Sequence, residues 1–327
     1  GDPGKAVEYA DRALRVRPDA VSLRMLKVQA LEQGSRLDEA EALIRQLMAR
    51  YPDNPVFRGT LMRFLVAHQR QDAAEAELRE ITARNPADSK AKLELVRFIG
   101  ATKGVDQARA ELEALIERDP ADNELTFALI GLLQARGDRA AAEALIRSLL
   151  ARSGEGRDAL RAKGLLAGYA LADGDRAGAR ALVDEILAKD GRDHQAVLLK
   201  ASMELDEGRL DGAISSLRLV LRDSPDSPRA LMLTARAHES QGAPVLAEDY
   251  YARAYEAGRA DVSYGGAYAE FLMRRGQSAR AEKLLAGMLA AHPGSIPVLR
   301  LLAQARNNQG NWTGARLAID EIRRLGG

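Results

Sequence analysis

Apolar residues recur along this chain at the three- and four-residue spacing of an amphipathic helix, in stretches that begin shortly after a glycine. Four clear examples are GDRAAAEALI (137–146), GRLDGAISSL (208–217), GAPVLAEDYY (242–251) and GQSARAEKLL (276–285). Each has Gly, four further residues, Ala, and then an apolar stripe. Val, Ile and Thr form no alternating runs of the kind that marks half-buried strands. The pattern therefore predicts an all-α protein.

The alanine of this pattern returns with a nearly constant period. It occupies positions 6, 40, 74, 108, 142, 179, 213, 247, 281 and 315, so eight of the nine intervals are 34 residues and one is 37. Twelve residues after most of these alanines stands a helix stop, which is Pro at 18, 52, 86, 120, 225 and 293 and Gly at 154 and 191. The period indicates ten copies of a second helix, each ended by a turn.

A unit of 34 residues made of helix, turn and helix, with Ala at position twenty and Pro at position thirty-two, resembles the tetratricopeptide repeat. The resemblance covers the whole chain, with full repeats beginning near 21, 55, 89, 123, 157, 194, 228, 262 and 296. It implies a right-handed α–α superhelical solenoid in which each repeat packs on its neighbours. Residues 1–20 match the second helix of a truncated repeat, so we expect the chain to be cut from a longer array.

The repeats fall into two groups by their eighth position. It is bulky in the first four full repeats (Val28, Met62, Val96, Ile130) and Ala in the last five (Ala167, Ala201, Ala235, Ala269, Ala303). The change coincides with a three-residue insertion around 153–158. We therefore predict an N-terminal subsegment of four repeats over 21–156 and a C-terminal subsegment of five over 157–327. Paired helices should lie farther apart before residue 157 than after it.

Composition excludes several classes of function. With 48 Lys+Arg against 47 Asp+Glu the formal net charge is +1, which gives no bulk attraction to nucleic acid. There is no cysteine, and the four histidines lie in different repeats without a metal-ligand spacing. No apolar run approaches the ~18 residues of a membrane span. We expect no catalytic residues, no cofactor, no metal, no nucleic-acid partner and no direct membrane span.

Five of the eight tyrosines cluster between 248 and 268. They could form an aromatic ligand patch. The alternative, which we favour, places Tyr251, Tyr255, Tyr264 and Tyr268 inside the stack of helices and leaves Tyr250 as the exposed member.

In this family the first helix of each repeat lines the concave surface through positions two, five, nine and twelve. The resemblance implies the partner-binding residues Arg63, Lys90, Arg97, Phe127, Gly131, Gly164, Gly168, Leu198, Ser202, Leu205 and Arg236. A glycine weakens a helix by ~1 kcal/mol relative to alanine. The three glycines therefore need a reason, and close approach of a partner backbone and tight packing between helices are both open. The family's carboxylate clamp is absent, because position six never holds Asn.

The resemblance implies a non-catalytic protein–protein interaction scaffold that binds a protein or peptide segment in its concave groove. Repeats of the form AEALIRQLMARYPDNP (40–55) are similar to those of proteobacterial envelope proteins, including tetratricopeptide proteins of exopolysaccharide synthesis and export. This similarity favours a periplasmic or envelope location over a cytoplasmic one. The alternative is the recognition arm of a larger enzyme, such as a glycosyltransferase, whose catalytic domain lies outside this sequence. An RNA-binding array is disfavoured by the charge balance and the scarce aromatics.

Overall fold

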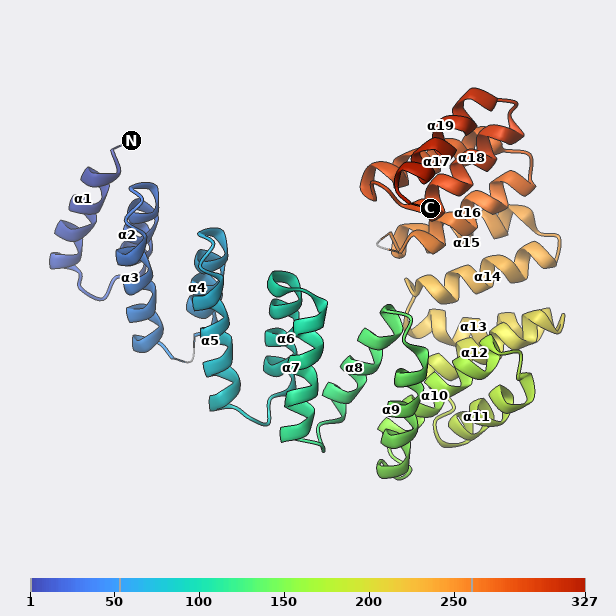
Figure 1. Cartoon of the computed structure of the whole chain (residues 1–327), viewed down its shortest axis with the longest axis horizontal. Coiled ribbons are helices and arrows are strands. Elements are labelled where there is room, and N and C mark those ends of the chain that lie inside the picture. Colours follow the sequence, from blue (N-terminus) through green and yellow to red (C-terminus); the bar gives the residue numbers. More distant parts are fainter. Residues whose placement is uncertain (1, 53, 260, 327) are drawn as a thin grey trace. The chain divides into compact units, whose positions relative to one another are not determined.

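The computed structural model describes residues 2–52, 54–259 and 261–326. Within these ranges the backbone forms nineteen α-helices and no strand (Figure 1), which confirms the all-α prediction. The chain divides into two compact units, Gly1–Leu145 and Ile146–Gly327. The three segments predicted from the sequence, 1–20, 21–156 and 157–327, stay a prediction.

The first unit contains α1 (Pro3–Val16), α2 (Val21–Gln33), α3 (Leu37–Arg50), α4 (Pro55–Ala67), α5 (Gln71–Arg84), α6 (Ser89–Lys103), α7 (Val105–Arg118) and α8 (Asn123–Ala135). Helix α9 (Arg139–Arg152) begins in the first unit and ends in the second. The second unit continues with α10 (Arg157–Ala172), α11 (Arg176–Lys189), α12 (His194–Asp206), α13 (Leu210–Asp223), α14 (Pro228–Ser240), α15 (Pro244–Ala257), α16 (Val262–Arg274), α17 (Ser278–Ala291), α18 (Ile296–Asn308) and α19 (Trp312–Arg324).

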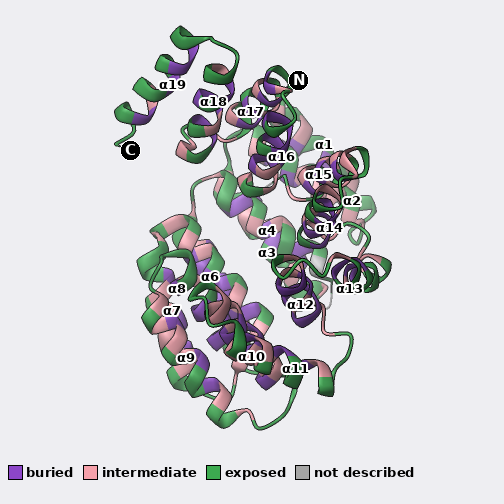
Figure 2. Cartoon of the chain, turned by 90° about the vertical axis from the view of Figure 1, so that its right-hand side faces the viewer, coloured by how far each residue is buried: buried purple, intermediate pink, exposed green. Residues whose placement is uncertain are grey.

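The periodic alanines lie where helices meet. Nine of the ten are buried, and Ala6, near the start of α1, is half-buried. Ala40 and Ala74 belong to one apolar cluster of the first unit, and Ala247 and Ala281 to one of the second. Figure 2 shows buried residues on the helix faces that meet neighbouring helices and exposed residues on the outer faces. The 34-residue period therefore records contacts between adjacent helices, as stacked repeats require.

Five residues before the periodic alanine, the backbone is left-handed ahead of every second helix from α3 to α19 except α7. Gly276 has φ +71° there, a conformation that glycine adopts without steric cost. In two repeats of the first unit the same position holds Ser35 (φ 56°) and Gln69 (φ 57°) instead. The turn geometry thus persists where the glycine is lost, at the cost of backbone strain.

The two helices of a repeat are in backbone contact more extensively in the second unit. Their Cα atoms lie within 8 Å over more of their length in every pair from α10–α11 to α18–α19 than in α2–α3, α4–α5 or α6–α7. Position eight is alanine in these closer pairs and Val28, Met62 or Val96 in the others. The difference has the direction expected from the size of this side chain.

The clustered tyrosines contribute to the core of the second unit. Tyr251 and Tyr268 are buried, with ring centroids 6.5 Å apart, and Tyr251 donates a hydrogen bond to Glu239 at 2.9 Å. Tyr250 is half-buried rather than exposed, and its ring stacks on His238 at 5.4 Å. The interior interpretation is confirmed for the two buried rings.

Candidate functional site

Five of the eleven predicted partner-binding residues lie in the first unit. Arg63 on α4 and both Lys90 and Arg97 on α6 are exposed, whereas Phe127 on α8 is buried. Gly131 on α8 is exposed, and a Cβ built there would meet no atom within 4 Å. The three cations and the glycine are therefore accessible to a partner, and Phe127 presents little surface.

The other six lie in the second unit and are listed by helix: Gly164 and Gly168 on α10, Leu198, Ser202 and Leu205 on α12, and Arg236 on α14. Leu198 is buried in the apolar cluster formed by α12, α13 and α14. Ser202 and Leu205 are half-buried. Arg236 is exposed and lies 3.4 Å from the carboxylate of Asp206.

The three glycines have different surroundings. Gly164 is buried, and a Cβ there would come within 3.3 Å of the Gln195 side chain. Gly168, one turn later, is half-buried, and a Cβ there would meet nothing within 4 Å. Packing between helices therefore accounts for Gly164 but not for Gly168 or Gly131. Close approach of a partner backbone at these two glycines stays a prediction.

Helix α4 presents a stripe that the sequence analysis named only in part. Val56, Gly59, Arg63 and Val66 occupy positions two, five, nine and twelve of their repeat, and all four are exposed. Val56 is 62% exposed and Val66 is 52% exposed, and a Cβ at Gly59 would meet no atom within 4 Å. The spacing of three and four residues places them on one helix face. An open apolar and cationic stripe thus runs along α4.

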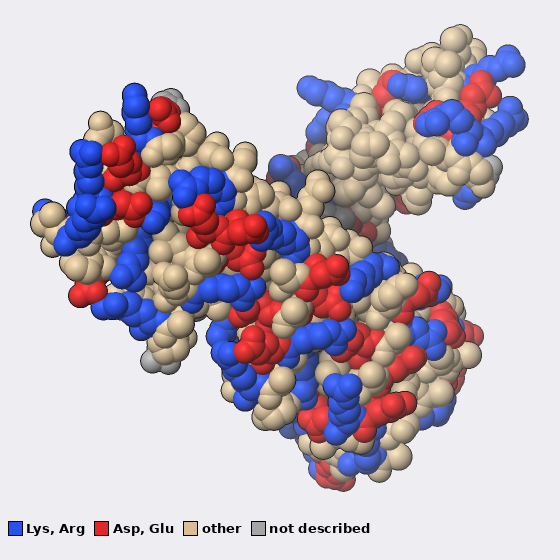
Figure 3. All heavy atoms as spheres, turned by 60° about the vertical axis from the view of Figure 1, so that its left-hand side comes forward, with Lys and Arg blue, Asp and Glu red and all other residues tan. Residues whose placement is uncertain are grey.

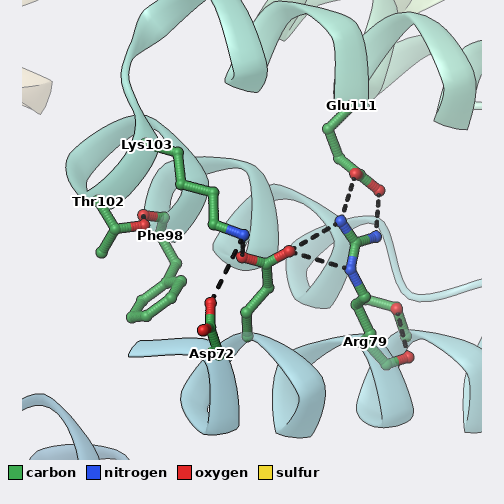
Figure 4. A network of polar contacts seen from close by, with 8 residues as sticks. Asp72, Arg79, Phe98, Thr102, Lys103 and Glu111 are labelled. Atoms are coloured by element: carbon green, nitrogen blue, oxygen red, sulfur yellow. Dashed lines mark hydrogen bonds and ion pairs between the residues drawn. The ribbon is translucent and has the colours of Figure 1, made fainter. Parts of the chain in front are cut away.

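The second helices of neighbouring repeats are tied together by ion pairs. Arg79 on α5 lies 2.8 Å from Glu111 on α7 and 3.0 Å from Glu75, whose carboxylate also lies 2.6 Å from Lys103 (Figure 4). The hydrogen bond from Lys103 holds the pKa of Glu75 below its usual range, despite burial. The hydrogen bond to Glu111 raises the pKa of Arg79. Each of these four charged side chains therefore has a partner of opposite charge within the protein.

The arginines of the second helices α3 and α5 differ in charge pairing from three cations on the first helices α4 and α6. All four arginines of α3 and α5 have a carboxylate partner: Arg45, Arg50, Arg79 and Arg84. On one face of the molecule, Figure 3 shows basic and acidic side chains lying next to one another over much of the surface. By contrast, among residues that the structure describes, no ion pair reaches Arg63, Lys90 or Arg97. Arg63 makes only a 3.4 Å hydrogen bond to Thr60. These three cations are free to meet a partner's acidic groups.

An apolar crevice of about 560 Å³ opens between α6, α7 and α8. Its lining includes Leu93 and Val96 from α6, Val105 from α7 and Leu132 from α8. Two arginines, Arg97 and Arg136, are its only charged lining residues within the described part of the chain. The crevice adjoins the free cations of α6 because Arg97 belongs to both. Of its lining residues, only Arg97 is among those predicted from the sequence.

Other chemistries have little support in the described residues. Over 2–52, 54–259 and 261–326 no group of three or more His, Asp or Glu side chains is arranged to hold a metal ion. None of the helices found in those ranges is long and apolar enough to cross a membrane.

Comparison with known proteins identifies the repeats. Three family models, each described as tetratricopeptide repeat, match the chain. The first matches residues 31–95, the second matches residues 1–55, 165–228 and 204–262, and the third matches residues 266–305. No curated protein matches the chain in sequence.

Solved structures share the fold at low identity. The chain resembles a chain of the APC/C hetero-tetramer Cut9–Hcn1 (TM-score 0.57, 14% identity, 92% of this chain and 58% of that one). It also resembles yeast Tom70 (TM-score 0.53, 15% identity, 99% of this chain and 82% of that one). A third similar structure is a tetratricopeptide repeat protein from Parabacteroides merdae (TM-score 0.50, 15% identity, 73% of this chain and 93% of that one). The chain thus spans little more than half of the Cut9–Hcn1 chain it matches.

Tetratricopeptide repeats form protein–protein interaction scaffolds that are typically non-catalytic, with binding surfaces built from the repeated helices. The alanine period, the nineteen paired helices and the matched repeat models agree, and the chain belongs to the tetratricopeptide repeat family.

Proposed function

We propose that this chain is a non-catalytic scaffold that holds an extended or helical segment of a protein partner on the faces of its first helices. The observation that carries the proposal is the absence of ion pairs at Arg63, Lys90 and Arg97 among described residues, beside fully paired arginines on α3 and α5. Exposed cations without an internal partner attract acidic groups and steer association. The valines on either side of Arg63 supply apolar area for the bound state.

The partner segment is therefore acidic and partly apolar. Its carboxylates would lie against Arg63 and Arg97, and its apolar side chains would cover Val56 and Val66. A few such anchors dominate the affinity of most interfaces. In the second unit, Gly168 leaves room on α10 for the backbone of a bound segment, and the half-buried Leu205 on α12 offers apolar contact.

We place this scaffold in a bacterial envelope or exopolysaccharide assembly and export complex, in the periplasm or at the envelope. The support is the Ala-, Arg- and Gly-rich style of the repeats, as in residues 40–55. The second candidate is the recognition arm of a larger enzyme such as a glycosyltransferase. Fractionation of the native host with an antibody against this chain separates them: co-purification with envelope export proteins supports the first, and a catalytic domain on the same polypeptide supports the second.

A charge-reversal experiment tests the binding face. The native chain and an Arg63→Glu/Arg97→Glu variant are used to capture proteins from the native host. Arg118→Glu is the matched control, because Arg118 is exposed, lies on the second helix α7 and has no ion pair in the described structure. We expect the same partner with the native chain and the control, and its loss with the double variant. Equal capture by all three chains would place the binding face elsewhere.

A further inference from the structure

The crevice between α6, α7 and α8 lies beside an unusually short turn, the one that joins α6 to α7. Gly104 alone separates α6 from α7, with φ +99°, and only three residues lie between it and Ala108. In the repeat that follows, three residues separate α8 from α9, and four lie between Gly137 and Ala142. The turn is short because α6 continues to Lys103, whereas α7 begins three residues before Ala108, as α9 begins three residues before Ala142. The first residue of α7, Val105, is 50% exposed and lines the crevice.

The side chain at position eight adds to the opening. Val96 lies between α6 and α7, and it also lines the crevice. The corresponding residue is alanine in the five repeats of the second unit, where the paired helices are in backbone contact over more of their length. Valine occupies more space between two packed helices than alanine does. The hollow beside Val96 and Val105 has a volume of about 560 Å³, within the ~300–1,000 Å³ range of ligand pockets.

The charges around this hollow point to the occupant. Its lining carries no acidic residue in the part of the chain that the structure describes, and it carries two arginines. Arg136 is already ion-paired with Asp106. Arg97 is exposed, with no ion pair, on the same helix as the free Lys90. An apolar hollow beside an unneutralised guanidinium suits an apolar group that has a carboxylate next to it.

We propose that this crevice takes one bulky apolar side chain of the partner segment, with an acidic residue of the same segment on Arg97. The inference rests on the proposed function and names the anchor that the partner must carry. The anchor's side chain contacts Leu93, Val96 and Leu132 and covers Val105. The neighbouring carboxylate forms a bidentate pair with Arg97, a geometry that arginine favours.

Fluorescein-labelled synthetic peptides provide the probe. One peptide has Leu and Phe between Asp and Glu residues, a second has Ser in place of Leu and Phe, and a third has Lys in place of Asp and Glu. Fluorescence anisotropy with the full chain should show the acidic apolar peptide binding about tenfold more tightly than either of the others. Equal affinity for the acidic apolar and the serine peptides would overturn the inference.

Two variants with matched controls locate the binding. Val105→Asp, which puts a negative charge in the crevice, should weaken the acidic apolar peptide about tenfold, and Arg97→Ala should weaken it about fivefold. Val245→Asp is the control for the first, because Val245 is an exposed valine in the first turn of the second helix α15. Arg118→Ala is the control for the second. Both controls should bind as the native chain does, and equal losses in variants and controls would overturn the inference.

The failure of this inference differs from the failure of the proposed function. If Arg63→Glu loses the partner but Val105→Asp still captures it, the proposal that the crevice binds an apolar side chain is overturned. The proposal that the partner binds the first-helix face then still stands. Capture that is unaffected by either change would overturn both. Circular dichroism of each variant, matching that of the native chain, ensures that lost binding is not lost folding.

Discussion

Replacing Lys92 with methionine should destabilise the repeat interface that shapes the crevice. Lys92, on α6, is only 4% exposed, and its Nζ lies 2.9 Å from Asp122 and 3.0 Å from Asp119, in the turn that leads to α8. Asp122 also accepts a hydrogen bond from Ser89 at 2.9 Å. The lysine therefore ties α6 to the start of α8, the two first helices that border the hollow. Lys92→Met keeps the length of the hydrocarbon stem and removes the charge.

The size of the effect follows from what the substitution leaves behind. The Asp122 side chain is 6% exposed, so its carboxylate would be buried without a cation. Breaking one side of a buried pair costs about 3–5 kcal/mol. Asp119 is 41% exposed and regains water, and Asp122 keeps its bond to Ser89, so we expect the lower end, about 3 kcal/mol. In Lys92→Met/Asp122→Asn, which keeps a side-chain cap, most of this loss should be recovered.

The pH dependence supplies a second, independent check. Burial alone would raise the pKa of Asp122, but the hydrogen bonds from Lys92 and Ser89 outweigh burial and hold this pKa below its usual range. A lowered folded-state pKa gives stability that is present above the unfolded pKa of ~4 and is lost as pH falls through the folded value. Without Lys92 that contribution disappears, so the difference between the native chain and Lys92→Met should shrink as the solution is acidified.

Urea unfolding followed by far-ultraviolet circular dichroism gives the free-energy difference, and hydrogen exchange shows where it falls. Because repeats couple mainly to their neighbours, protection should drop first in α6, α7 and α8. A Lys92→Met chain within about 0.5 kcal/mol of the native one at pH 7 would refute the reasoning. So would a loss that stays constant down to acidic pH.

Three further substitutions test the backbone analysis by denaturant unfolding. Gln69→Gly should stabilise the chain by up to about 1 kcal/mol, because it removes left-handed strain of ~1–2 kcal/mol at a smaller entropic cost; a lower midpoint would contradict this. Gly168→Ala should stabilise by about 1 kcal/mol, since its Cβ meets no atom within 4 Å. Gly265→Ala should destabilise by about 1–3 kcal/mol, because its Cβ would lie 2.5 Å from the Met288 sulfur. If Gly265→Ala unfolded at a higher denaturant concentration than Gly168→Ala, the reasoning about the space around the two glycines would be contradicted.

The fold could be predicted because each repeat contacts mainly its neighbours. Ala40 and Ala74 are buried for the same local reason, and one residue type at one spacing reports every such contact. Position four of the repeat, a large aromatic in most of the family, holds Arg24 and Lys92 here. The sequence shows this replacement but not what the new side chains contact. Lys92 is buried there on two aspartates, while Arg24 instead donates to the carbonyl of Pro18 at 2.7 Å.

The candidate site could be predicted only in part. The family positions include Arg63 and Arg97, which are exposed, and also Phe127 and Leu198, which are buried. Burial depends on how each helix is rotated against its neighbours, and the position of a residue within the repeat does not specify that rotation. The pairing of a cation depends on acids some thirty residues away, as for Arg79 and Glu111.

The crevice had a signal in the sequence, although a slight one. The spacing from Gly104 to Ala108 is one residue shorter than the spacing from Gly137 to Ala142. The alanine period hides this difference, because Ala108 itself stays in register. The spacing does not indicate that Val105 is exposed and lines the same crevice as Arg97, which depends on how α6, α7 and α8 pack.

Site-specific photo-crosslinking tests the central claim, that the partner lies on the first-helix face, most directly. A photoreactive phenylalanine derivative replaces Val66, exposed on the first helix α4, or Ala83, exposed on the second helix α5 of the same repeat. The chain carrying either one is then irradiated in the presence of the captured partner. The account predicts a covalent adduct with the partner from position 66 and none from position 83. An adduct from position 83 alone would contradict it.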